Sequence, residues 1–182
     1  MRNFVTPTVV LSRCIEIDPC RYNGLKIAND FVKQLIPYVN IIPVCPEVEI
    51  GLGTPREALR IVMKDDKMRL IQPKTGLDFT EKMETFVNSF LKSLPDVDGF
   101  ILKGRSPTSA LKDARRYSGP NPSGAIKGKG PGFFGMAVLE RFSHLAIEEE
   151  GRLRIPNIKN NCLTKLYTLA NFRLLFCLKI FI

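Results

Sequence analysis

The sequence predicts an α/β protein: a Rossmann-like, open, mainly parallel sheet flanked by helices, in a single compact domain followed by a C-terminal extension. Three apolar runs without polar alternation, at 6–12, 39–44 and 99–103, are typical of strands buried on both faces. Helical patterns at 27–36, 79–94 and 133–142 alternate with these runs. Buried strands that alternate with helices favour a parallel sheet with helices on both of its faces.

The remaining elements are placed by local signals. Pro37 ends the helix expected at 27–36, because proline cannot continue a helix. The runs ALRIVM (58–63) and MRLIQP (68–73) flank KDDK, which predicts a hairpin. The stretch at 118–132 is rich in Pro, Gly and Ser and predicts a loop.

Charge divides the chain into a nearly balanced body and a basic tail. The net charge is +9 over 182 residues, and six basic residues without an acidic one follow Glu150. The body's remaining charge of +3 does not by itself indicate a nucleic-acid-binding protein. The basic tail leaves RNA or another anionic partner open, but a small-molecule substrate is favoured.

The character of the sequence changes after Gly151. Lys165, Arg173 and Lys179 interrupt the apolar residues of the tail, so we expect no membrane span. We expect an α/β domain over 1–155 and a basic, apolar extension over 156–182, which we interpret as the truncated start of a second, helical domain. Residues 1–13 lack a signal-peptide pattern, which indicates a cytoplasmic, reducing setting.

Two of the five cysteines follow buried strands directly. Cys14 follows the first strand and Cys45 the second, while the third runs into the turn SPTS at 106–109. Loops beyond neighbouring parallel strands converge, so these three loops are expected to surround one cleft. The two thiols are either inert core groups or ligands of a soft metal or an iron–sulfur cluster. Cys20 could join them or simply pack.

The stretch CPEVEIGLGTPRE (45–57) carries further candidates. Glu47 is either a general acid or base or a solvated loop carboxylate. Arg56 could bind an anionic group of a substrate or pair with Glu47, and Lys103 is a second candidate for substrate binding. The single histidine, His144, does not support a zinc site, and GKGPG does not match a phosphate-binding loop.

Five segments together resemble the 2-thiouracil desulfidase family, long described as a domain of unknown function: SRCIEIDPCRYNG, PVCPEVEIGLGTPRE, TGLDFTE, DGFILKGRSPTSALKD and ERFSHLAIEEEGRL. The resemblance covers about residues 5–155. It implies a 4Fe–4S cluster held by three cysteines, with one iron left open for the sulfur of a thiolated pyrimidine. Water then replaces that sulfur without net redox change, and hydrosulfide leaves.

The resemblance also implies roles for individual residues. Cys14 and Cys45 would be cluster ligands, Glu47 the acid–base group, and Ser106 the residue that orients substrate or water. The third ligand of the family is a cysteine in an SPSCG-type turn, and this chain has Ser109 at that position.

This departure leaves three alternatives at the third ligand position. The chain could be an impaired binding module of the same fold, Ser109 could ligate as an alkoxide, or Cys20 could supply the third thiolate. A serine hydroxyl is a hard, poor ligand for such a cluster. A further hypothesis is that the chain is a desulfidase that acts on thiouridine in tRNA and binds the RNA through its basic tail.

Overall fold

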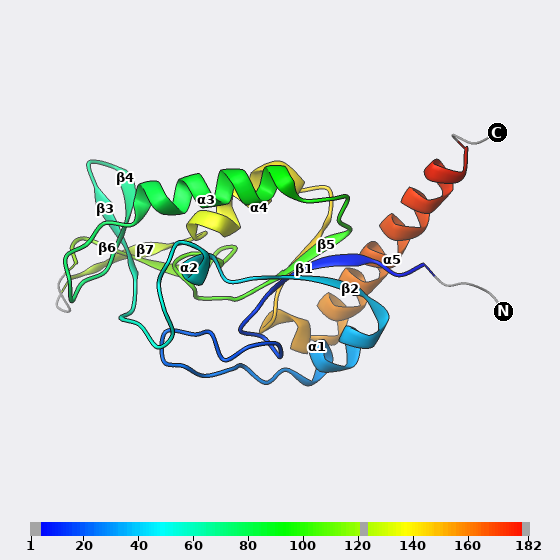
Figure 1. Cartoon of the computed structure of the whole chain (residues 1–182), viewed down its shortest axis with the longest axis horizontal. Coiled ribbons are helices and arrows are strands. Elements are labelled where there is room, and N and C mark those ends of the chain that lie inside the picture. Colours follow the sequence, from blue (N-terminus) through cyan, green and yellow to red (C-terminus); the bar gives the residue numbers. More distant parts are fainter. Residues whose placement is uncertain (1–4, 121–123, 180–182) are drawn as a thin grey trace.

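The central feature of the fold is a four-stranded sheet in which every neighbouring pair is parallel (Figure 1). The computed structural model describes residues 5–120 and 124–179, without the side chains of 176–179. The strands, in the spatial order β2-β1-β5-β8, are β2 (Asn40–Val44), β1 (Thr8–Ser12), β5 (Gly99–Leu102) and β8 (Ala146–Glu149). The three strands expected from the sequence are therefore parallel neighbours.

Helices cover both faces of this sheet, as expected. Alternate residues of β1 and β5 point to opposite faces. Val10 and Phe100 belong to one core with α3 (Thr80–Ser93) and α4 (Phe133–Phe142). Val9 and Ile101 belong to a second core with α1 (Asp30–Leu35) and α5 (Pro156–Lys179). This two-sided burial explains why β1 and β5 lack polar alternation.

A second sheet lies beside the first, in the order β4-β3-β6-β7. The predicted hairpin is confirmed as β3 (Arg60–Lys64) paired antiparallel with β4 (Lys67–Ile71). β6 (Ala114–Tyr117) joins β3 in parallel, and β7 (Ile126–Gly130) pairs antiparallel with β6. The prediction of a loop over 118–132 is therefore wrong for the β7 segment, where backbone pairing with β6 makes a strand of IKGKG.

Helix boundaries differ modestly from the prediction. Asn29 caps α1 by accepting a hydrogen bond from the backbone of Val32, so the helix begins three residues later than expected. The helix is continued by a single 3₁₀ turn, η1 (Ile36–Tyr38), and α2 (Pro46–Glu49) and η2 (Arg152–Arg154) are short connecting turns.

The tail forms α5, whose first part packs against the body. Leu166 and Ala170 are buried, and Leu166 lies close to the backbone of Gly99. Arg173 pairs with the buried carboxylate of Asp98, 2.7 Å away. Among the residues described, no helix is long and apolar enough to cross a membrane.

Candidate functional site

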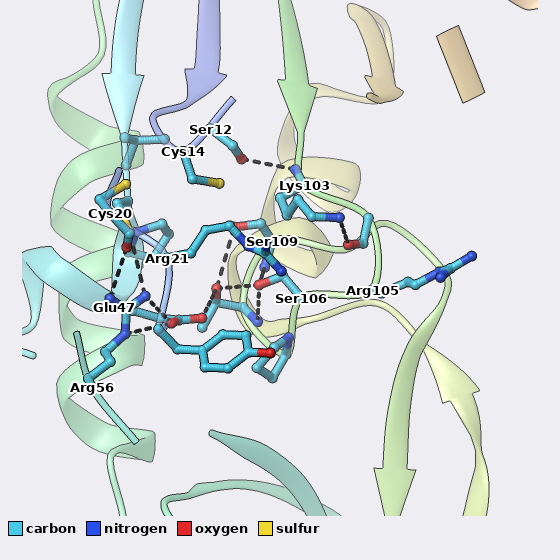
Figure 2. A pocket seen from close by; sticks show the side chains of 17 residues that line it. Ser12, Cys14, Cys20, Arg21, Glu47, Arg56, Lys103, Arg105, Ser106 and Ser109 are labelled. Atoms are coloured by element: carbon cyan, nitrogen blue, oxygen red, sulfur yellow. Dashed lines mark hydrogen bonds and ion pairs between the residues drawn. The ribbon is translucent and has the colours of Figure 1, made fainter. Parts of the chain in front are cut away.

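Three loops meet at the carboxyl end of the parallel sheet. The chain runs from β1 to β2 on one side and later returns to place β5 on the other side of β1, so the sheet reverses its order here. Ser12 at the end of β1 accepts a hydrogen bond of 2.9 Å from the backbone of Lys103 after β5. The loops enclose a cavity of about 270 Å³ lined by Cys14, Cys20, Cys45, Glu47 and the SPTS turn (Figure 2).

Three thiols lie on the wall formed by the loops after β1 and β2. Cys14, Cys20 and Cys45 are 8%, 5% and 8% exposed. The Sγ of Cys45 lies 3.7 Å from the backbone carbonyl of Cys20. Cys20, which the sequence left as either a third donor or a packing residue, therefore lines the same cavity as the other two.

The thiols differ in their proton affinity. A hydrogen bond from Cys14 lowers the pKa of Cys20 to about 6, against an opposing effect of burial, and Arg13 adds a second hydrogen bond. The same Cys14–Cys20 bond raises the pKa of Cys14, with burial acting in the same direction. Burial raises the pKa of Cys45 to about 11. In the metal-free protein, Cys20 is therefore the thiol that most readily becomes a thiolate.

Glu47 is held by Arg56 on one side and by the SPTS turn on the other. It lies on α2 with its side chain 13% exposed, so it is not a solvated loop carboxylate. Its Oε2 accepts hydrogen bonds from Nε (2.9 Å) and Nη2 of Arg56. Its Oε1 accepts a hydrogen bond of 3.2 Å from Thr108. The carboxylate is thus fixed in place at the cavity wall.

Arg56 pairs with Glu47, which is one of the two alternatives expected from the sequence. Besides Glu47, it donates to the carbonyls of Cys20 (2.9 Å) and Gly53 (3.2 Å). Its side chain is only 5% exposed. Arg56 therefore joins the Cys20 loop to the Glu47 helix, and it also lines the cavity.

The SPTS turn forms the wall opposite the thiols. The Oγ of Ser106 accepts the backbone N–H groups of Thr108 (3.2 Å) and Ser109 (3.1 Å) and lies 2.9 Å from the Thr108 hydroxyl. Thr108 and Ser109 are both buried. Sequence reasoning missed Thr108, whose only signal was a hydroxyl inside the turn; its contact with Glu47 spans 61 residues of sequence.

Of the other residues singled out in the sequence, Lys103 lines the cavity, whereas His144 and Cys162 lie apart from it. The Nζ of Lys103 donates to Glu150 and to the carbonyl of Gly104, at 2.6 Å each. Cys162 lies on α5 and His144 is exposed just after α4, so neither lines the cavity; the side chain of Cys177 lies outside the described residues.

A comparison with models of protein families matches residues 9–150 to the 2-thiouracil desulfurase family. The chain belongs to this family. The match includes the three loops that line the cavity.

Two individual proteins similar to this chain give further comparisons. The uncharacterized protein YbbK of Bacillus subtilis (strain 168) is 33% identical over 54 residues, which make up 30% of this chain and 36% of that protein. The solved structure of TudS, a 4Fe–4S-dependent thiouracil desulfidase, matches with a TM-score of 0.61 and 22% identity. The match covers 86% of this chain and 97% of TudS. At this identity the likeness shows that the two share a fold.

The donor groups of the cavity can be tested against the requirements of a 4Fe–4S cluster. Such a cluster with one open iron takes three thiolates. Three thiols line the cavity, which fits in number and in chemistry. Ser109 offers only a hydroxyl, which does not fit a soft site. Within the described residues, no three or more His, Cys, Asp or Glu side chains form a group that could hold a single metal ion.

Proposed function

We propose that this chain is a non-redox desulfidase, which replaces the sulfur of a thiolated pyrimidine of the 2-thiouracil type by oxygen and releases hydrosulfide. The observation that carries this proposal is the meeting of three thiols and one fixed carboxylate in a single cavity, in a chain of the 2-thiouracil desulfurase family. The cavity of about 270 Å³ lies just below the range of about 300–1,000 Å³ that is typical of small-molecule sites, which favours a small ligand.

The residues that would hold the cluster are Cys14, Cys45 and Cys20. Cys20 is favoured over Ser109 as the third donor because it is a thiol on the same wall as the other two, with the lowest pKa among them. When bound, the cluster would supply an open iron, a Lewis acid for the soft thiocarbonyl sulfur.

Glu47 is the acid–base group of the proposal. Arg56 fixes Oε2, so Oε1 is the oxygen that can receive a proton from the attacking water and return it later. The hydroxyl of Ser106 is committed to the SPTS turn, where it accepts two backbone N–H groups. We therefore assign Ser106 the role of shaping the wall against which the substrate or water is oriented.

The second candidate is a catalytically impaired binding module of the same fold. Ser109 favours it, because this buried cavity residue stands where the family resemblance implies a cysteine ligand, and a hydroxyl is a poor ligand for an iron–sulfur cluster. In that case the cavity would bind a thiolated pyrimidine without turnover.

A larger substrate is also compatible with the site. A second cavity of about 590 Å³ shares Tyr22 and Glu47 with the first and is lined further by Arg115, Tyr117 and Lys129. A thiolated pyrimidine that carries a sugar or an anionic group could extend into it, as the thiouridine alternative requires. Competition of uridine and of uracil with 2-thiouracil for the protein separates the two substrate sizes.

Iron and acid-labile sulfide per chain, measured after anaerobic reconstitution, test the assignment of the third donor. The variants are Cys20→Ser and Ser109→Cys, beside the unchanged chain and Cys162→Ser as a matched control. We expect the unchanged chain and Cys162→Ser to hold about four iron and four sulfide, and Cys20→Ser to lose most of both. Cluster binding by Ser109→Cys alone would establish the impaired module instead.

A further inference from the structure

The hydroxyl of Ser109 has no role as a ligand in the proposed site, yet it is buried at the cavity wall. Ser109 is 4% exposed and lines the cavity with Glu47. Between the two lies Thr108, which is 1% exposed. The Oγ1 of Thr108 contacts Glu47 Oε1 at 3.2 Å and Ser109 Oγ at 3.4 Å.

The direction of these hydrogen bonds follows from which groups carry protons. A carboxylate only accepts, so the single hydroxyl proton of Thr108 is donated to Glu47. Thr108 can then only accept from its neighbours Ser106 (2.9 Å) and Ser109 (3.4 Å). A hydroxyl oxygen has two lone pairs, so both bonds can form together.

Ser106 and Ser109 differ in whether the lone pairs of their hydroxyl oxygens remain free. Both lone pairs of Ser106 are occupied by the backbone N–H groups of Thr108 and Ser109. The Oγ of Ser109 receives no N–H hydrogen bond from the part of the chain that the structure describes. With its proton directed to Thr108, Ser109 therefore keeps its lone pairs for a donor in the cavity, whereas Ser106 does not.

We propose that Ser109 and Thr108 form a hydroxyl relay that connects a proton donor in the cavity with Oε1 of Glu47. A water or substrate group in the cavity gives its proton to Ser109 Oγ, while Ser109 passes its own proton to Thr108 and Thr108 passes its own to Glu47. The donor loses one proton, Glu47 gains one, and both hydroxyls end unchanged. The catalytic use of the relay rests on the proposed desulfidase function; the hydrogen-bond chain does not.

This relay gives position 109 a function that a cysteine would not fulfil. A thiol is a weak hydrogen-bond donor and acceptor, so it would transmit protons to Thr108 poorly. The distance of 3.4 Å between Ser109 Oγ and Thr108 Oγ1 is the longest within the relay. We expect this distance to shorten when a donor occupies the cavity.

The hydrogen-bond chain is tested without any turnover by proton NMR of threonine-labelled protein. The hydroxyl proton of Thr108 should be protected from exchange and shifted downfield by its carboxylate acceptor. Glu47→Gln should move this resonance upfield, and Ser109→Ala should move it by a smaller amount. A Thr108 hydroxyl proton that exchanges too fast to observe would overturn the proposal. So would a resonance whose chemical shift is unchanged in Glu47→Gln.

The relay itself is tested by sulfide release from 2-thiouracil with the reconstituted full chain. Ser109→Ala and Thr108→Val should each lower kcat about 100-fold at an unchanged KM. Thr108→Ser, which keeps the hydroxyl, should recover most of that loss, and Thr75→Val should match the unchanged chain. Full kcat in Ser109→Ala, or equal losses in Thr108→Val and Thr108→Ser, would refute the relay. If the unchanged chain releases no sulfide, the proposed function fails, and the Thr108 resonance alone decides the hydrogen-bond chain.

Discussion

Replacing Arg56 by alanine should destabilise the protein strongly, because this side chain joins two of the loops that form the site. Its guanidinium donates to Glu47 and to the carbonyls of Cys20 and Gly53. The ion pair is largely buried, with Arg56 5% and Glu47 13% exposed. Removing the cation leaves the carboxylate and the Cys20 carbonyl without these partners.

The expected loss follows from that burial. Breaking one side of a buried ion pair costs about 3–5 kcal/mol, because the remaining charge stays desolvated. For a protein of this length, about 3 kcal/mol lowers Tm by about 6–12 °C. Arg56→Lys should recover only part of this loss, since a lysine cannot reproduce the two-pronged hydrogen bond to Glu47.

Thermal unfolding of the cluster-free, reduced protein, followed by circular dichroism, measures the effect. Lys74→Ala is the matched control, because it removes a cation from an exposed pair in which Lys74 and Glu57 are 71% and 46% exposed. That control should leave Tm nearly unchanged, because an exposed ion pair contributes little to stability. If Arg56→Ala lowers Tm no more than Lys74→Ala, the buried ion pair does not hold the site together.

Three further outcomes are expected. Leu166→Ala should lower the free energy of unfolding by about 3 kcal/mol in chemical denaturation, because Leu166 is buried between α5 and the sheet. Leu174→Ala, at a 45% exposed position, should change it by no more than about 0.5 kcal/mol. Equal losses in the two variants would mean that α5 does not pack as described. Gly99→Ala should lower Tm because its Cβ would collide with the carbonyl of Ala146, and an unchanged Tm would contradict that close approach. In metal-free protein, thiolate absorbance should rise near pH 6, and Cys20→Ser should lack this step. Because the pKa of Cys20 is lowered from 9.0 to about 6, its thiolate stabilises the fold above pH 9, and this contribution disappears as the pH falls to about 6. A single rise in thiolate absorbance near pH 9 would refute the lowered pKa of Cys20.

Part of the fold was accessible from the sequence because burial leaves a pattern. β1 and β5 face a core on each side, so their runs contain no polar alternation. β6, β7 and β8 leave no such pattern. IKGKG becomes a strand only through backbone pairing with β6, and the acidic end of β8 is tolerated because Glu149 accepts a hydrogen bond from the backbone of Leu111.

The convergence of the three loops at the site was also predictable from the sequence, but the hydrogen bonds between these loops were not. Cys14, Cys45 and the SPTS turn each follow an apolar strand, so their convergence follows from strand order. The bond from Thr108 to Glu47 depends on how the turn folds, which the residue types alone do not specify. The same holds for Arg56, whose contact with the Cys20 carbonyl spans 36 residues of sequence.

The measurement that tests the central claim most directly is the release of hydrosulfide from 2-thiouracil by the anaerobically reconstituted chain, with uracil quantified in the same reaction. We expect equal amounts of hydrosulfide and uracil over many turnovers, and no release by Glu47→Gln with its cluster content unchanged. A chain that holds a full cluster and binds 2-thiouracil but releases no hydrosulfide would contradict the proposed function.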